Sequence, residues 1–136
     1  VKMKTDQIKL EFQNEYKGKV IAPNGEIKIG RGENEYAPYH LLYGALGSCY
    51  YLTFLALCRK QKLEFDRVKI TIDGEKHETS VALLKEVIVD VEIWSKDDKE
   101  RITKAAGQGA KYCSIYNTIQ SIPAEVILKV KVYDEY

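Results

Sequence analysis

Residues 37–49 read APYHLLYGALGSC, and this stretch decides the fold because it begins the longest apolar run of the 136-residue chain. Pro38 suits the first turn of a helix, where the N–H that proline lacks would have no partner. Apolar side chains occupy most sides from Pro38 to about Gln61, which predicts a central and largely buried helix. Its two glycines and Ser48 favour a core helix over a membrane span.

Alternation of apolar and polar residues on both sides of this helix predicts strands. Three strands precede the helix and three follow it, near residues 8–12, 18–22, 26–29, 68–73, 87–93 and 126–132. Between the second and third strands, Pro23-Asn24-Gly25 is typical of a hairpin turn in which the Asn-Gly pair supplies a positive φ.

A second helix is predicted between the fifth and sixth strands. The segment 95–98, SKDD, resembles a capping box with acidic residues in the first turn. The helix extends to about Tyr112, where we expect a break and a second segment through Ile119 that Pro123 ends. The order βββ-α-ββ-α-β predicts an α+β fold with antiparallel sheets around two central helices, in a single domain over residues 1–136.

Composition excludes several classes of protein. The 21 Lys and Arg residues against 20 Asp and Glu leave a net charge of +1, which disfavours a nucleic-acid-binding protein. Residues 1–6 show no apolar leader and the three cysteines are widely spaced, so we expect a reducing cytoplasm and no membrane partner. His40, His77 and the cysteines lack metal-ligand spacing, and no glycine-rich phosphate motif is present, so we expect neither metal nor cofactor.

Small residues form two patches, 44–48 on the first predicted helix and 105–110 on the second, and each runs toward a cysteine, Cys49 or Cys113. Glycine inside a helix costs about 1 kcal/mol relative to alanine, so it usually has a packing reason. Either the patches serve tight packing alone, or the helices cross there and bring Cys49 and Cys113 within disulfide range. Cys58 follows Cys49 by nine residues, which places it on the opposite side of the same helix.

The segment 37–49 resembles the Pro-x-x-Leu-Leu…Ala-Leu-Gly-x-Cys signature of the OsmC/Ohr family, the osmotically induced protein C and organic hydroperoxide resistance proteins. Residues 110–115, AKYCSI, resemble the second cysteine motif of that family, in the form found in its YhfA-like branch. The two motifs occur in the family order, and the likeness extends over essentially the whole chain. The resemblance implies an OsmC-like fold and an intertwined homodimer with a site at each end of the dimer interface.

The resemblance also implies chemistry at two cysteines. Cys49 would be the peroxidatic thiol, which attacks the O–O bond of an organic hydroperoxide or hydrogen peroxide and becomes a sulfenic acid. Cys113 would be the resolving thiol, which condenses with that sulfenic acid to a disulfide. A dithiol reductant of the lipoyl or thioredoxin type would then reopen the disulfide by exchange.

This chain departs from the hydroperoxide branch in the groups that activate the thiol. That branch uses an arginine from an N-terminal strand and a glutamate directly after the proline, whereas here no arginine precedes Arg31, and Tyr39 and His40 follow the proline. Helical spacing sets His40 about 13 Å along the axis from Cys49, so we expect another segment or a partner chain to activate it. The candidates for activating or lining the site are Lys9, Lys17, Lys19, Arg31, Tyr39, His40 and Tyr43.

The missing arginine and glutamate keep a second function open. In that alternative, the protein is a non-catalytic homodimer of the same fold that binds a small apolar or thiol-bearing ligand.

Overall fold

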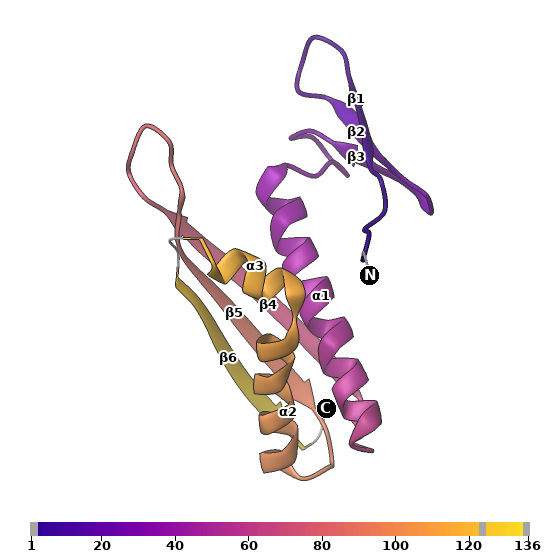
Figure 1. Ribbon diagram of the computed structural model, residues 1–136, viewed down its shortest axis with the longest axis vertical. Helices are drawn as coiled ribbons and strands as arrows, with labels where there is room; N and C mark the ends of the chain where they lie inside the picture. Colours follow the sequence, from indigo (N-terminus) through magenta and orange to yellow (C-terminus); the bar gives the residue numbers. More distant parts are fainter. Residues whose placement is uncertain (1–2, 123–124, 135–136) are drawn as a thin grey trace. The chain divides into compact units, whose positions relative to one another are not determined.

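The computed structural model describes residues 3–122 and 125–134. Its strands and helices are, in chain order, β1 (Lys9–Phe12), β2 (Gly18–Ala22), β3 (Gly25–Ile29), α1 (Pro38–Lys60), β4 (Arg67–Lys76), β5 (Leu84–Trp94), α2 (Lys99–Tyr112), α3 (Ser114–Gln120) and β6 (Glu125–Tyr133) (Figure 1). The chain divides into two compact units, residues 1–44 and 45–136. The predicted α+β class is confirmed.

The first unit contains the antiparallel sheet β1-β2-β3. A two-residue turn joins β2 to β3, and Gly25 directly after it adopts a φ of 153°, a value that favours glycine. Apolar side chains on this sheet remain exposed within the chain, with exposed fractions of 55% for Leu10, 45% for Phe12 and 47% for Ile27. The sheet therefore leaves much of its own apolar surface uncovered.

The second unit is built on the sheet β4-β5-β6, with β5 in the middle. Val87, Val89, Val91 and Ile93 of β5 are each at most 1% exposed and alternate with half-buried residues. The period-2 pattern in the sequence thus marks the face of the central strand that the core covers. Buried residues of α1 and α2 complete this core.

The expectation of purely antiparallel sheets is wrong at β6. This strand pairs with β5 in parallel, in a register that runs from Glu86 opposite Glu125 to Trp94 opposite Tyr133. Parallel neighbours need a long crossover connection, and α2 and α3 provide it by carrying the chain from the end of β5 back to the start of β6 (Figure 1).

The expectation that α1 is largely buried is also wrong for the single chain. Its fully buried residues form one stripe at a spacing of four, namely Leu46, Tyr50, Phe54 and Cys58, whereas Leu52 is 67% exposed. Packing covers this one side of the helix and leaves apolar residues on the others. With a mean hydropathy of 1.6 over 18 residues, α1 is long and apolar enough to cross a membrane, a property that core helices of soluble proteins share.

The N-terminus of α2 differs in detail from the predicted capping box. Asp98 is the N-cap residue, and its side chain accepts a hydrogen bond from the backbone N–H of Arg101 at 3.1 Å. Ser95 is fully buried instead, and its hydroxyl donates to the backbone carbonyl of Glu64 at 2.6 Å. Segment 95–98 contains three residues that can act as an N-cap, one Ser and two Asp. The sequence therefore predicted that a cap would form there but not which of the three residues would form it.

The predicted break after Tyr112 is confirmed. Cys113 has extended backbone, with φ −77° and ψ 121°, and α3 begins directly after it. The side-chain amide of Asn117 donates to the carbonyls of Ala110, Lys111 and Cys113, the last at 2.8 Å, and so links the end of α2 to the start of α3. The expected end at Pro123 lies outside the described residues.

Of the four patch glycines, Gly109 is the one at which α2 packs closely on α1. A Cβ added there would lie 3.1 Å from the ring of Tyr50. Gly47 faces β4 instead, and a Cβ at Gly44 or Gly107 would meet no atom of the described residues within 4 Å. The glycines of the two patches therefore do not meet in the described residues, because Gly109 approaches α1 at Tyr50 and Phe54, beyond the 44–48 patch.

Candidate active site

Cys49 and Cys113 lie together in the second unit, close enough that each shifts the pKa of the other. Cys49 lies on α1 and is half-buried, whereas Cys113 lies in the extended link between α2 and α3 and is fully buried. Both are free thiols. Solvent therefore reaches part of Cys49, whereas Cys113 is closed off from it.

Packing around Tyr50 fixes α2 against α1 and so sets the position of this cysteine pair. Tyr50 follows Cys49 directly, is fully buried, and donates its hydroxyl to the backbone carbonyl of Ala106 at 2.7 Å. The same ring lies against Gly109, one turn before Cys113. A hydrogen bond and a close backbone approach thus hold the C-terminal half of α2 at the level of Cys49.

The pKa of Cys49 lies below its ordinary value. Partial burial acts to raise the pKa, but hydrogen bonds to the sulfur act in the opposite direction and outweigh it. These bonds come from the backbone of Ile115, the side chain of Cys113, and the side chain and backbone of Ser114. The Ser114 hydroxyl oxygen lies 3.8 Å from the Cys49 sulfur. Because such bonds favour the anion, Cys49 is the member of the pair that forms a thiolate more readily.

The pKa of Cys113 is shifted in the opposite direction. Burial raises it most, and the hydrogen bond and charge of Cys49 raise it further. The backbone N–H of Tyr116, 3.3 Å from the Cys113 sulfur, acts to lower the pKa without reversing the shift. A thiolate at Cys49 therefore faces a protonated thiol at Cys113.

Cys58 belongs to the buried stripe of α1 and is 1% exposed. Burial, and to a smaller extent the charge of Asp97, raises its pKa to about 11. At neutral pH this sulfur is a protonated, inaccessible thiol.

Three further candidates from the sequence, Tyr39, His40 and Tyr43, make contacts inside the first unit. The Nδ1 atom of His40 accepts the backbone N–H of Ala37 at 2.9 Å, which satisfies a donor at the start of α1. The rings of Tyr39 and Tyr43 meet edge to face, with centroids 5.6 Å apart. Their expected place beside Cys49 stays a prediction.

The basic candidates of the first unit also have partners there. The Arg31 guanidinium lies 5.5 Å from the ring centroid of Tyr16. Lys17 pairs with Glu35 at 3.2 Å, and Lys19 is 3.6 Å from a carboxylate oxygen of Glu26. The predicted role of Lys9 also stays a prediction.

Glu35 is the acid most firmly held in this unit. The pKa of its carboxyl lies below the usual value, first because the backbone N–H of Gly32 donates to it at 2.8 Å and second because Lys17 is bonded to it. The carboxylate therefore ties the loop after β3 to the segment before β2.

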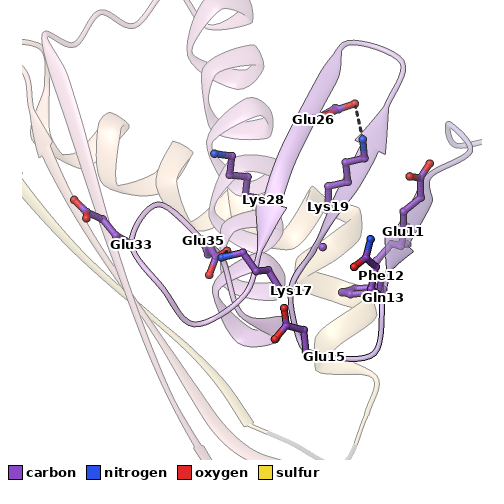
Figure 2. A pocket seen from close by; sticks show the side chains of 12 residues that line it. Glu11, Phe12, Gln13, Glu15, Lys17, Lys19, Glu26, Lys28, Glu33 and Glu35 are labelled. Atoms are coloured by element: carbon purple, nitrogen blue, oxygen red, sulfur yellow. Dashed lines mark ion pairs between the residues drawn. The ribbon is translucent and has the colours of Figure 1, made fainter.

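An open hollow of about 940 Å³ lies on the first unit, and Figure 2 shows lysines and glutamates around it. The ion pair between Lys19 and Glu26 crosses part of its lining. Opposite charges are interleaved there and the lining residues include no thiol, so the hollow offers no nucleophile for the expected chemistry. Among residues 3–122 and 125–134, no group of three or more His, Cys, Asp or Glu side chains is arranged to hold a metal ion.

Sequence reasoning missed Ser114 and Ile115 as partners of Cys49. It looked for a cation, whereas the partners are a hydroxyl and backbone N–H groups in the first turn of α3. The break at Cys113 was the available signal, because a helix that restarts beside a cysteine presents free N–H groups.

The family model for OsmC-like proteins matches residues 30–127, a range that contains both Cys49 and Cys113. The chain belongs to the OsmC-like family. The resemblance drawn from the two cysteine motifs is thereby confirmed. No curated protein matches the chain.

Solved structures share the fold of this OsmC-like protein over almost their full length. An OsmC-like protein from Mycoplasma pneumoniae has a TM-score of 0.86 and 17% identity, with 96% of this chain and 98% of that chain covered. A protein from Aquifex aeolicus VF5 has a TM-score of 0.81 and 22% identity, with 97% and 100% covered. An organic hydroperoxide resistance protein from Legionella pneumophila has a TM-score of 0.74 and 16% identity, with 96% and 99% covered. At these identities the likeness shows the fold alone.

Proposed function

We propose that this OsmC-like protein is a thiol-dependent peroxidase that reduces organic hydroperoxides or hydrogen peroxide. Membership of the family, some of whose structural neighbours are organic hydroperoxide resistance proteins, supports a peroxide-related role. Cys49 is the proposed peroxidatic thiol and Cys113 the resolving thiol. The proposed setting is a reducing cytoplasm, where a dithiol of the lipoyl or thioredoxin type supplies electrons.

One arrangement supports this assignment most: the half-buried Cys49, whose sulfur lies 3.8 Å from the Ser114 hydroxyl and whose pKa is lowered, is paired with the fully buried Cys113, whose pKa is raised. A peroxidatic thiol needs solvent access and a lowered pKa, and Cys49 is half-buried with a pKa below its ordinary value. A resolving thiol needs to be adjacent and to survive the peroxide, and burial protects Cys113.

The proposed reaction has three steps. The Cys49 thiolate attacks the terminal oxygen of the hydroperoxide, so that an S–O bond forms as the O–O bond breaks, and the alkoxide leaves as an alcohol after taking a proton from solvent. The Cys113 thiol then attacks the sulfenic sulfur, which forms the disulfide and releases water with the proton of the thiol. A dithiol finally donates two electrons by exchange and restores both thiols.

The proposed enzyme is a homodimer. Its support is the apolar surface that the single chain leaves uncovered, on the first sheet at Leu10, Phe12 and Ile27 and on α1 at Leu52. Exposed apolar patches of this kind mark interaction surfaces. Sedimentation at micromolar concentration tests this proposal, and a stable 15.6 kDa monomer would contradict it.

A non-catalytic ligand-binding homodimer is the second candidate. One observation favours it: the groups in the described part of the chain that lower the pKa of Cys49 are hydrogen-bond donors, and none is a cation. A thiolate held without a positive charge is less strongly stabilised than one beside arginine. Peroxide consumption separates the two candidates, since the binder would react no faster than free cysteine.

The test is peroxide consumption by the reduced protein with several dithiols, compared among three variants. We expect Cys49→Ser to abolish consumption and Cys58→Ser to retain it. Cys113→Ser should allow one turnover and then stop, with Cys49 overoxidised. Equal loss in the Cys49 and Cys58 variants would contradict the assignment.

A further inference from the structure

Ser114 is the first residue of α3, but its hydroxyl does not cap that helix. The N-cap of α3 is Cys113, whose sulfur accepts the backbone N–H of Tyr116, so the Ser114 hydroxyl has no capping duty. Its partner within residues 3–122 and 125–134 is the Cys49 sulfur, at 3.8 Å. Ser114 is otherwise exposed to solvent. Its contact with the Cys49 sulfur is therefore the interaction through which its hydroxyl can affect the site.

The direction of this hydrogen bond depends on the charge of Cys49. Toward a neutral thiol, either atom can be the donor, whereas a thiolate can only accept. The hydroxyl therefore bonds more strongly to the anion than to the thiol, since a hydrogen bond to a charged group is roughly twice as strong as a neutral one. The contact thus favours the reactive form of the sulfur and restricts where that sulfur lies.

We propose that Ser114 is a positioning residue for Cys49, whose hydroxyl holds the thiolate toward solvent and performs the task that a cation performs in other thiol enzymes. The inference rests on the proposed peroxidase function for its purpose, but the contact is open to test without any peroxide. Among the described residues, Cys113 is the titratable group that faces Cys49 from the α2–α3 link. No titratable group of β4 or of the rest of α1 is among the causes that shift the pKa of Cys49 there.

Ser114→Ala tests this role, because the side chain is exposed and its methyl replacement fits the helix. Thr118→Ala is the matched control: it removes a hydroxyl from the same exposed face of α3, one that donates to the backbone carbonyl of Ser114 rather than to a sulfur. Ser114→Thr keeps the hydroxyl and serves as the rescue variant.

The measurement is the rate of Cys49 alkylation by iodoacetamide from pH 5 to 10, followed by mass spectrometry of the peptide. We expect Ser114→Ala to move the midpoint to higher pH and to slow alkylation at pH 7 roughly three- to tenfold, the ratio that corresponds to one lost hydrogen bond of this kind. Thr118→Ala should match the wild type, and Ser114→Thr should recover most of the rate.

A Ser114→Ala protein with the midpoint and rate of the wild type would overturn the inference. So would an equal shift in the Thr118→Ala control, because the effect would then belong to α3 as a whole. Peroxide consumption is measured on the same samples. A shifted midpoint without peroxide turnover keeps the role of Ser114 and contradicts the peroxidase, whereas turnover with an unshifted midpoint contradicts the role of Ser114 alone.

Discussion

Gly109 offers a direct test of how α2 is held beside Cys49. Replacing glycine by alanine inside a helix stabilises it by about 1 kcal/mol when the new methyl group has space. At Gly107 the methyl would meet no described atom within 4 Å, so Gly107→Ala should gain most of that amount. At Gly109 the same methyl would lie 3.1 Å from the ring of Tyr50.

Tyr50 cannot easily move away from that methyl. Its ring is fully buried and its hydroxyl is bonded to the Ala106 carbonyl at 2.7 Å. Overpacking by one methyl in such a place costs about 1–3 kcal/mol, which cancels or exceeds the gain in helix propensity. We therefore expect Gly109→Ala to be about 1–3 kcal/mol less stable than Gly107→Ala.

Urea unfolding of the two variants and the wild type measures this difference, with the three proteins compared at one concentration. Because Gly109 lies one turn before Cys113, we also expect slower disulfide formation on peroxide treatment of Gly109→Ala, and an unchanged rate for Gly107→Ala. Equal stabilisation by both substitutions would refute the packing argument, since it would mean that α2 has free space on the side that faces α1.

Three further predictions follow from single side chains. Cys58→Ser should leave peroxide consumption nearly intact. Because the pKa of Cys58 is about 11, native Cys58 should also resist iodoacetamide at pH 8 while Cys49 reacts, and peptide mass spectrometry measures the two alkylation rates. Tyr50→Phe should lower the free energy of unfolding by about 1 kcal/mol through loss of the bond to Ala106, as urea titration would show. Glu35→Gln should destabilise the protein at neutral pH. Because the folded pKa of Glu35 is below 4.5, its contribution is complete above that pH and is lost as the pH falls through the lower folded value, so unfolding curves of variant and wild type should converge in acid.

Local sequence patterns predicted most of the strands and helices, because residues near each other in the sequence determine where such an element forms. Alternation marked β5 and β6, and the acceptor-rich segment 95–98 marked the start of α2 within a few residues. The direction of β6 and the exposure of α1 depend on which elements pack together. A strand alternates in the same way whether it pairs in parallel or antiparallel, and a helix has the same apolar content whether its own chain covers it or not. Sequence reasoning therefore got both of these features wrong.

The candidate site divides in the same manner. Cysteine motifs indicated Cys49 and Cys113 as the candidate pair, because thiols are rare and their spacing is distinctive. The donors around Cys49 were missed because two of them are backbone N–H groups, which leave no trace in residue type. Ser114 does carry a side-chain signal, but a serine after a cysteine is common and acquires meaning only from the 3.8 Å contact.

The central claim is that Cys49 and Cys113 act as a pair, and one measurement tests it most directly. Reduced protein is treated with one equivalent of an organic hydroperoxide, quenched with iodoacetamide, and digested without reductant for mass spectrometry. The account predicts a peptide pair linked by a Cys49–Cys113 disulfide, with Cys58 recovered as the free thiol. Oxidation of part of Cys49 to sulfinic acid with no disulfide to Cys113, or three cysteines recovered without any oxidation after the peroxide, would contradict it.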